Sequence, residues 1–170
     1  MKETLEELSG FFPTHAESAE DNILPLLESR VVDHVLYLGP KTNTNISTTQ
    51  PIEFIIEVKQ LDALTVSGSG NVEAKRIDSQ HFEVSVSGVG NVMMEGKAGE
   101  LNIRLSGTGN FQGEEFITKR ATVTISGLGN VVVNVSDSLN ADMSGVGSVE
   151  YIGSPQVHQS VSGLGRVKKR

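Results

Sequence analysis

The residues best suited to chemistry lie near the end of the sequence. Asp142, His158 and Ser160 supply the residue types of an orienting acid, a base and a nucleophile. His158 and Ser160 are two residues apart on one expected strand, which separates their Cα atoms by roughly 7 Å. That distance is too long for a hydrogen bond unless both side chains lean together. We therefore interpret the three as part of a solvated sheet face and expect the chain to have no catalytic residues.

Metal and cofactor sites are also unsupported by the spacing of residues. The four histidines, His15, His34, His81 and His158, are scattered, without the paired spacing of metal ligands. The absence of cysteine excludes thiolate metal sites, disulfides and cysteine nucleophiles. The motif SGxGN lacks the third glycine of a dinucleotide-binding loop, and no helix is expected to follow it. The sequence predicts no cofactor and no bound metal.

Length and charge limit the class of protein. The 170 residues are 37% hydrophobic, which suits one domain with at most a small appendage. The net charge of −7 argues against nucleic acid as a partner, because phosphate binding needs clustered Lys and Arg. No apolar run approaches the roughly 20 residues that span a bilayer, so we expect no membrane span.

The dominant feature is an internal repeat in the last two-thirds of the chain. Six hexapeptides begin at intervals of 20, 19, 20, 18 and 18 residues. They are SGSGNV from Ser67, SGVGNV from Ser87, SGTGNF from Ser106, SGLGNV from Ser126, SGVGSV from Ser144 and SGLGRV from Ser162. A nearly constant period of this length is typical of a solenoid, in which each repeat is one coil stacked on the next.

The residues around each hexapeptide indicate the kind of coil. Apolar residues alternate with polar ones before it, as in Phe82, Val84 and Val86, and this period of two predicts a strand with one buried face. A second short strand is expected after it, with residues such as Val92 pointing inward. The predicted fold is all-β: a β-solenoid of about six regular coils of 18–20 residues, stacked about 4.8 Å apart.

The hexapeptides are expected to form the corners of the coils. Their glycines allow a positive φ or a close approach between coils, and their asparagines would stack as an amide ladder. Ser148 and Arg166 replace asparagine in the last two copies, as expected of terminal repeats. The predicted corner residues are Gly68, Gly70, Asn71, Gly88, Gly90, Asn91, Gly107, Gly109, Asn110, Gly127, Gly129, Asn130, Gly145, Gly147, Gly163 and Gly165.

The first third of the chain is less regular. Residues 1–20 are expected to form a weakly ordered tail, and they lack the basic start and apolar stretch of an export signal. Either the protein is cytoplasmic or the beginning of its chain is missing. Residues 21–66 are expected to form the leading coils of one domain that spans 21–170, with strands at Val31 to Leu38 and Pro51 to Val58. Pro25 limits a short helical turn between them and the tail.

These motifs resemble the head GIN domain family of auto-transporter adhesins over about residues 21–170. The resemblance is carried by the repeated SGxGNV, by NILPLLESRVVDHVLYL and PIEFIIEVKQLDALTVSGSGNV, and by GVGSVEYIGSPQVHQSVSGLGRVKKR. It implies a single-stranded right-handed β-helix, an extracytoplasmic location in the periplasm or at the cell surface, and no catalytic residues. The family's leading strand and export signal are not recognisable in residues 1–20.

Two classes of function remain open, with an enzyme as a distant third. The first is a non-enzymatic adhesin-like module that presents stacked polar rows to a protein or an envelope component, with Glu83, Arg104, Asp142 and His158 as candidate contacts. The second is a structural spacer or self-assembling scaffold, and the third a polysaccharide-acting β-helix enzyme. Aromatic residues fall in the inward register, which weakens sugar binding. The terminal VKKR is interpreted as a charged cap on the open edge of the last coil, with a basic binding patch as the alternative.

Overall fold

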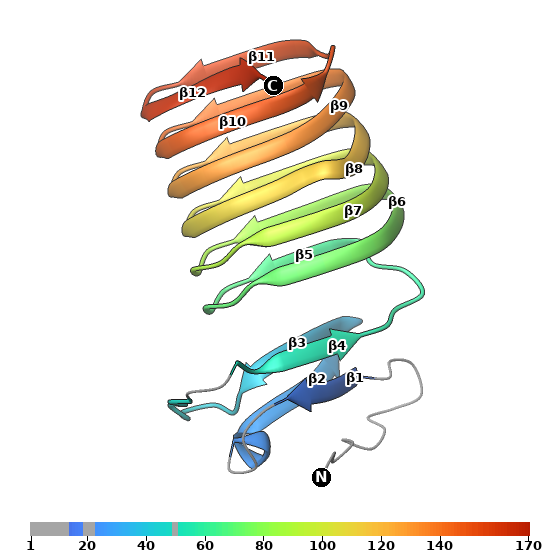
Figure 1. Cartoon of the computed structure of the whole chain (residues 1–170), viewed down its shortest axis with the longest axis vertical. Coiled ribbons are helices and arrows are strands. Elements are labelled where there is room, and N and C mark those ends of the chain that lie inside the picture. Colours follow the sequence, from blue (N-terminus) through green and yellow to red (C-terminus); the bar gives the residue numbers. More distant parts are fainter. Residues whose placement is uncertain (1–13, 19–22, 49–50) are drawn as a thin grey trace. The chain divides into compact units, whose positions relative to one another are not determined.

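The structure, a computed structural model, describes residues 14–18, 23–48 and 51–170 (Figure 1). The chain falls into two compact units, residues 1–59 and 60–170, which are described separately. Most of the expected tail, residues 1–20, lies outside the described residues; its residues 14–18 form a strand. The expectation of one domain over residues 21–170 stays a prediction.

The described residues of the N-terminal unit form two antiparallel strand pairs. Strand β1 (Thr14–Ser18) pairs with β4 (Glu53–Ile56), and β2 (Leu27–Val32) pairs with β3 (Val35–Pro40) after the 3₁₀ turn η1 (Leu24–Leu26). The expectation of one strand from Val31 to Leu38 is therefore wrong. Asp33 and His34 adopt φ values of 49° and 65°, and two successive positive φ angles make the tight turn of a hairpin.

The second unit is a β-solenoid, as the repeat predicts. Its neighbouring coils pair through parallel strands in a regular register. The strands are β5 (Ala63–Val66), β6 (Val72–Val86), β7 (Val92–Leu105), β8 (Thr108–Ile125), β9 (Leu128–Met143), β10 (Val146–Gly153), β11 (Gln156–Val161) and β12 (Leu164–Lys169). No helix in the described ranges is long and apolar enough to cross a membrane.

Strands β6 to β9 are longer than the alternating pattern predicts. Each begins within one hexapeptide and continues, through a wide bend, to the residue before the next one (Figure 1). Register shifts in the bend, such as the one between Gly113 and Ile117, allow the strand to curve without ending. Each coil therefore has a tight hexapeptide corner on one side and a wide bend on the other. We call the strand segments before the hexapeptides the upstream face and those after them the downstream face.

The core of the second unit follows the predicted alternation. Ile125 is fully buried and pairs in register with Leu105 and Met143 of the adjacent coils, while its neighbour Thr124 is exposed. In the wide bend, the buried ring of Phe116 lies edge-on to Phe82, with 6.0 Å between ring centroids. Burial of each such side chain contributes about 1.5–3 kcal/mol to stability, so the rows together supply the main driving force for folding.

In the first coil, one of the inward-facing rows begins with a polar residue in place of an apolar one. Asp62 occupies the position that Phe82 and Leu101 hold in the next two coils. Its Oδ1 lies 2.8 Å from Ser79 Oγ and 3.0 Å from Gln60 Nε2. Hydrogen bonds from Gln60 and Ser79 lower the pKa of Asp62, so its carboxylate stays charged where the apolar row ends.

Close approach between backbones explains the glycines of the corners. At Gly109, a Cβ atom would lie 1.7 Å from the carbonyl oxygen of Gly90 in the preceding coil. Backbone hydrogen bonds such as Thr108 N to Gly88 O, 2.9 Å, hold the corners at this separation. Gly70 belongs to the first corner, and a Cβ there would meet no atom within 4 Å. The steric demand for glycine therefore arises from stacking.

The inward register predicts opposite effects for adjacent substitutions. Ile125→Asp places an unpaired carboxylate in a closed apolar row, which should cost about 4 kcal/mol or more, or prevent folding. Thr124→Asp points to solvent and should change stability by less than about 1 kcal/mol. Urea denaturation of both variants measures the difference, and equal midpoints would contradict the register.

The corner geometry predicts a similar contrast between two glycines. Gly109→Ala should destabilise the protein by at least about 2 kcal/mol, because backbone atoms of Gly90 cannot move aside as a flexible side chain could. Gly70→Ala has open space and should cost less than about 1 kcal/mol. Thermal unfolding followed by circular dichroism provides the comparison. A large loss for Gly70→Ala would show that backbone conformation, not stacking, selects glycine.

Candidate binding surface

The asparagines of the corners form the expected ladder along the downstream face. Asn91 donates its backbone N–H and its Nδ2–H to Asn71 Oδ1, both at 3.0 Å. Asn110 donates in the same way to Asn91 at 3.2 and 2.8 Å, and Asn130 to Asn110 at 3.1 Å for both bonds. The ladder ends where Ser148 Oγ donates to Asn130 Oδ1 at 2.8 Å.

The ladder presents mainly donors to its surroundings. The side-chain oxygens of Asn71, Asn91 and Asn110 each accept two hydrogen bonds, which uses both lone pairs. Each bonded Nδ2 group uses one of its two hydrogens for the ladder and keeps the other. Because parallel strands repeat at about 4.8 Å, the ladder is a line of spare amide N–H groups at that spacing.

Arg166 takes the last position in the same row. It pairs in register with Ser148, and its side chain is exposed. Within the described ranges, its guanidinium has no hydrogen-bond or ion-pair partner, although it interacts electrostatically with Glu150. The row thus ends with a cation whose donors are uncommitted.

A shallow hollow of about 470 Å³ lies beside the ladder on the downstream face. One side of it is formed by Asn110, Asn130, Ser148 and Arg166, and Val132 and Gln112 belong to its floor. Glu150 lies in register with Val132 in the same floor row, and the other side carries Glu114 and Arg170. The hollow therefore combines amide, hydroxyl, guanidinium and carboxylate groups around the apolar side chain of Val132.

The carboxylates of the hollow form ion pairs with Lys168 of the last strand and with Arg170 just after it. Glu150 lies 2.9 Å from Lys168 Nζ and 4.0 Å from Arg170 Nε, and Glu114 forms an ion pair and hydrogen bond with Arg170. The hydrogen bond from Lys168 lowers the pKa of Glu150 below its ordinary value. The terminal basic residues thus make contacts with neighbouring coils on this face.

The candidate outer-face residues occupy the exposed rows of the upstream face. Glu83 forms an ion pair with Arg104 of the next coil. Asp142 pairs in register with Ser160, whereas His158 lies beside Asn140. In the part of the chain that the structure describes, Asp142, His158 and Ser160 make no hydrogen bonds with one another.

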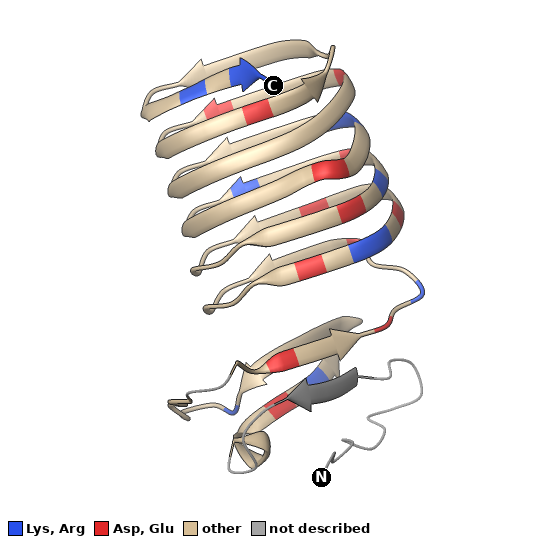
Figure 2. Cartoon of the chain, in the orientation of Figure 1, with Lys and Arg blue, Asp and Glu red and all other residues tan. Residues whose placement is uncertain are grey.

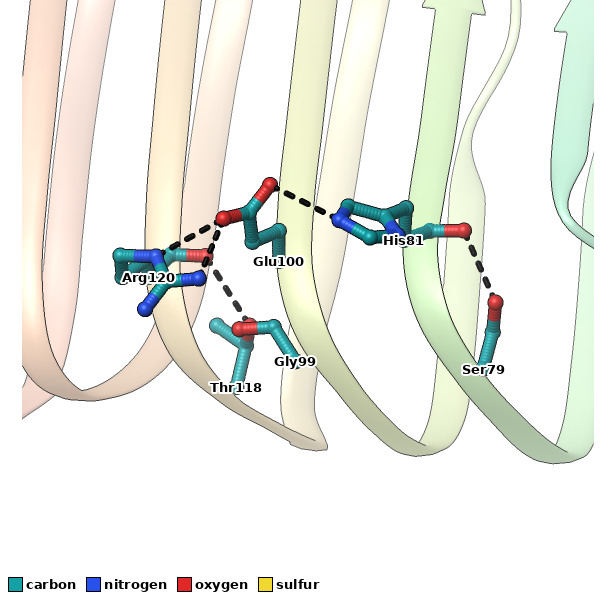
Figure 3. Close-up of polar contacts among 6 residues, drawn as sticks. All are labelled: Ser79, His81, Gly99, Glu100, Thr118 and Arg120. Atoms are coloured by element: carbon teal, nitrogen blue, oxygen red, sulfur yellow. Dashed lines mark hydrogen bonds and ion pairs between the residues drawn. The ribbon is translucent and has the colours of Figure 1, made fainter.

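A polar cluster near the wide bend was not anticipated from the sequence (Figure 3). Glu100 lies between His81 and Arg120 of the two adjacent coils: His81 Nε2 is 3.3 Å from Glu100 Oε2, and Arg120 Nε donates to Glu100 Oε1 at 2.9 Å. Each of these three residues stands six positions before the serine of its hexapeptide. Extending the alignment of repeats by one position would therefore have found the row.

The cluster ties coils together rather than forming an enclosed site. Ser79 Oγ and Thr118 Oγ1 lie 2.8 and 3.0 Å from the backbone carbonyls of His81 and Arg120, so these hydroxyls support the strand (Figure 3). His81 is largely exposed. No group of three or more His, Asp or Glu among the described residues is placed to hold a metal ion.

The tight corners carry an apolar ridge. The third residue of successive hexapeptides aligns along the stack, and the exposed Val89, Leu128, Val146 and Leu164 form this ridge, with Thr108 between Val89 and Leu128 and Ser69 at its first position. Figure 2 shows that charged residues lie on the faces and wide bends, and the hexapeptides contain none before Arg166. The ridge is thus an uncharged line on an acidic protein.

The geometry defines a β-solenoid repeat protein with polar rows on two faces and an apolar ridge at its corners. The chain belongs to the family described as "Putative auto-transporter adhesin, head GIN domain", which matches residues 18–155. No curated protein matches the chain.

Solved structures from Bacteroides fragilis and Parabacteroides distasonis are similar to this chain. A structure from Bacteroides fragilis, described as a putative adhesin, is 23% identical with a TM-score of 0.70, covering 94% of this chain and 82% of its own. One from Parabacteroides distasonis, described as a putative lipid binding protein, is 17% identical with a TM-score of 0.49, covering 94% and 83%. The first of these confirms the fold.

The pKa of Glu100 predicts how its cluster responds to acid. The hydrogen bond from Arg120, aided by the charges of Arg120 and His81, lowers this pKa below its ordinary value. The ionised Glu100 carboxylate therefore stabilises the folded protein at pH values above the pKa of Glu100 in the unfolded chain. This stabilisation is lost as the pH falls through the lower pKa of Glu100 in the folded protein. Glu100→Gln should lower the melting temperature slightly near neutral pH, and the difference from wild type should shrink toward about pH 3.

The matched control for this measurement is Asp142→Asn. The Asp142 carboxylate is exposed and makes no hydrogen bond in the described part of the chain. Its melting curve should follow that of wild type across the same pH range. If the difference in melting temperature between Glu100→Gln and wild type stays constant with pH, the ionised Glu100 carboxylate does not stabilise the fold.

Proposed function

We propose that this protein is a non-catalytic binding module that acts outside the cytoplasm and contacts a component of the cell envelope through its downstream face. The observation that carries the proposal is the line of spare amide donors beside the hollow. A ligand with repeated acceptors can bind several coils at once, so affinity accumulates over weak contacts. Membership in a family described by the word adhesin supports the same function.

A non-catalytic role agrees with the distribution of polar groups. Catalysis by the Asp142, His158 and Ser160 set would need mutual hydrogen bonds and shelter from water, and the three side chains are exposed without such bonds among the described residues. Glu83 and Arg104 neutralise each other on the same face. The downstream face, with its hollow, is therefore the better binding surface.

The binding proposal predicts the effect of obstructing the hollow. Val132→Arg places a long side chain on its half-buried floor and should reduce co-sedimentation with isolated cell envelopes of the source organism by at least about tenfold. Thr124→Arg adds the same charge on the upstream face and should bind as wild type does. Equal binding by both variants and wild type would refute use of the downstream face.

Catalysis is tested separately with the same protein. Wild type, His158→Ala and Asp142→Ala are screened against polysaccharide hydrolase and lyase substrates. We expect no turnover by any of the three, whereas removal of a true catalytic base lowers the rate by orders of magnitude. Turnover that either substitution abolishes would overturn the non-catalytic function.

The apolar ridge favours a second candidate, self-assembly of the chain. Its side chains repeat with the coil spacing, so a second copy presents a ridge of the same period. The uncharged corners also allow two acidic chains to meet there with little repulsion. Sedimentation velocity over a range of concentrations tests this candidate: Leu128→Ser should weaken any association that wild type shows. A monomer at all concentrations would exclude it.

A further inference from the structure

We propose that the hollow binds an acidic sugar unit of an envelope polymer, with the Arg166 guanidinium holding its carboxylate. This inference rests on the proposed function, because it assigns a ligand class to the same surface. It begins from Arg166, which lines the hollow at the end of the amide ladder and has no hydrogen bond or ion pair within the described residues.

Arg166 is suited to a carboxylate by its geometry and by its neighbours. A guanidinium offers parallel N–H donors that match the two oxygens of a carboxylate. The competing carboxylate, Glu150, already has Lys168 at 2.9 Å and Arg170 at 4.0 Å. Arg166 therefore has only an electrostatic interaction with Glu150, and its donors are available to a ligand.

The remaining walls of the hollow suit hydroxyl groups. Asn110 and Asn130 each keep one side-chain N–H after the ladder bonds, and these can donate to a hydroxyl oxygen. Glu114 and Glu150 keep carboxylate lone pairs that can accept a hydroxyl proton. Val132, half-buried on the floor, provides a small apolar surface for the C–H side of a sugar ring.

These features favour an acidic sugar over a neutral sugar or an acidic peptide. No Phe or Tyr side chain is exposed among the described outward rows of the second unit, so a neutral sugar lacks a stacking platform of that kind and needs another anchor. An acidic peptide side chain would satisfy Arg166 but would bring no hydroxyl donors to Glu114 and Glu150. A uronic acid carries both the carboxylate and the hydroxyls.

The test is an NMR titration of the full chain, labelled with ¹⁵N, at neutral pH. The probes are a disaccharide of glucuronic acid, its neutral glucose counterpart and an aspartate-containing dipeptide. The signals followed are the side-chain amides of Asn110 and Asn130 and the Nε–H of Arg166. We expect saturable shifts of all three with the glucuronic acid disaccharide, and at least about tenfold weaker binding of the other two probes.

Two variants separate a specific site from general attraction to positive charge. Arg166→Gln should weaken binding of the acidic disaccharide by at least about tenfold, because the charge-assisted pair is lost. Lys169→Gln removes the same charge from the same strand, but Lys169 contacts Ser154 and does not line the hollow. It should change the dissociation constant by less than about twofold. Equal weakening in the two variants would refute the Arg166 site.

The remaining outcomes distinguish this inference from the proposed function. Absence of saturable shifts with the disaccharide overturns the acidic-sugar assignment, and tighter binding of the dipeptide at the same signals replaces it with an acidic peptide. If Val132→Arg still abolishes envelope binding in either case, only the ligand class is wrong. If Val132→Arg binds envelopes as wild type does, the proposed use of the downstream face is wrong as well.

Discussion

The close stacking of backbone on backbone is the constraint on which the solenoid depends. At each tight corner, carbonyl oxygens of one coil occupy the space that a side chain of the next would need, as Gly90 does for Gly109. Glycine allows the corners to approach, and the parallel hydrogen bonds can then continue from one coil to the next. Because the coils keep one register on the faces beside the corners, the corner motif sets the position of the rows on those faces.

The fixed register places equivalent side chains of successive coils next to one another, so that they form continuous rows on the surface. A single asparagine side chain is a weak hydrogen-bonding group, but the ladder of four saturates the side-chain oxygens of Asn71, Asn91 and Asn110 and leaves a line of spare donors. The same register brings Glu100 between His81 and Arg120. An exposed hydrogen bond or ion pair at an isolated surface position contributes little to stability. Here such interactions are repeated from coil to coil, and they cost no further backbone entropy because the packed core has already ordered the backbone.

At a few positions one coil carries a residue that differs from its equivalents in the other coils, and these positions give the surface its local chemical character. Asp62 ends an apolar row at the first coil with hydrogen bonds to Ser79 and Gln60. Arg166 ends the asparagine row at the last coil, where Lys168 and Arg170 neutralise the nearby carboxylates. A uniform stack would present the same shallow face along its whole length. The hollow lies where the row changes from amides to a hydroxyl and a guanidinium.

The sequence by itself determined the solenoid, its coils and its inward rows, because the period near 20 and the alternation of two are local properties of the chain. It also placed Ser148 and Arg166 at the end of the ladder. Only the tertiary structure decided that strands β6 to β9 continue through the wide bends, because the register shifts there depend on pairing between coils. Val31 to Leu38 folds as a hairpin because two residues adopt positive φ, which the hydrophobic pattern does not reveal. The hollow likewise depends on side chains from Asn110 to Arg170 that stacking alone brings together, so no single repeat contains it.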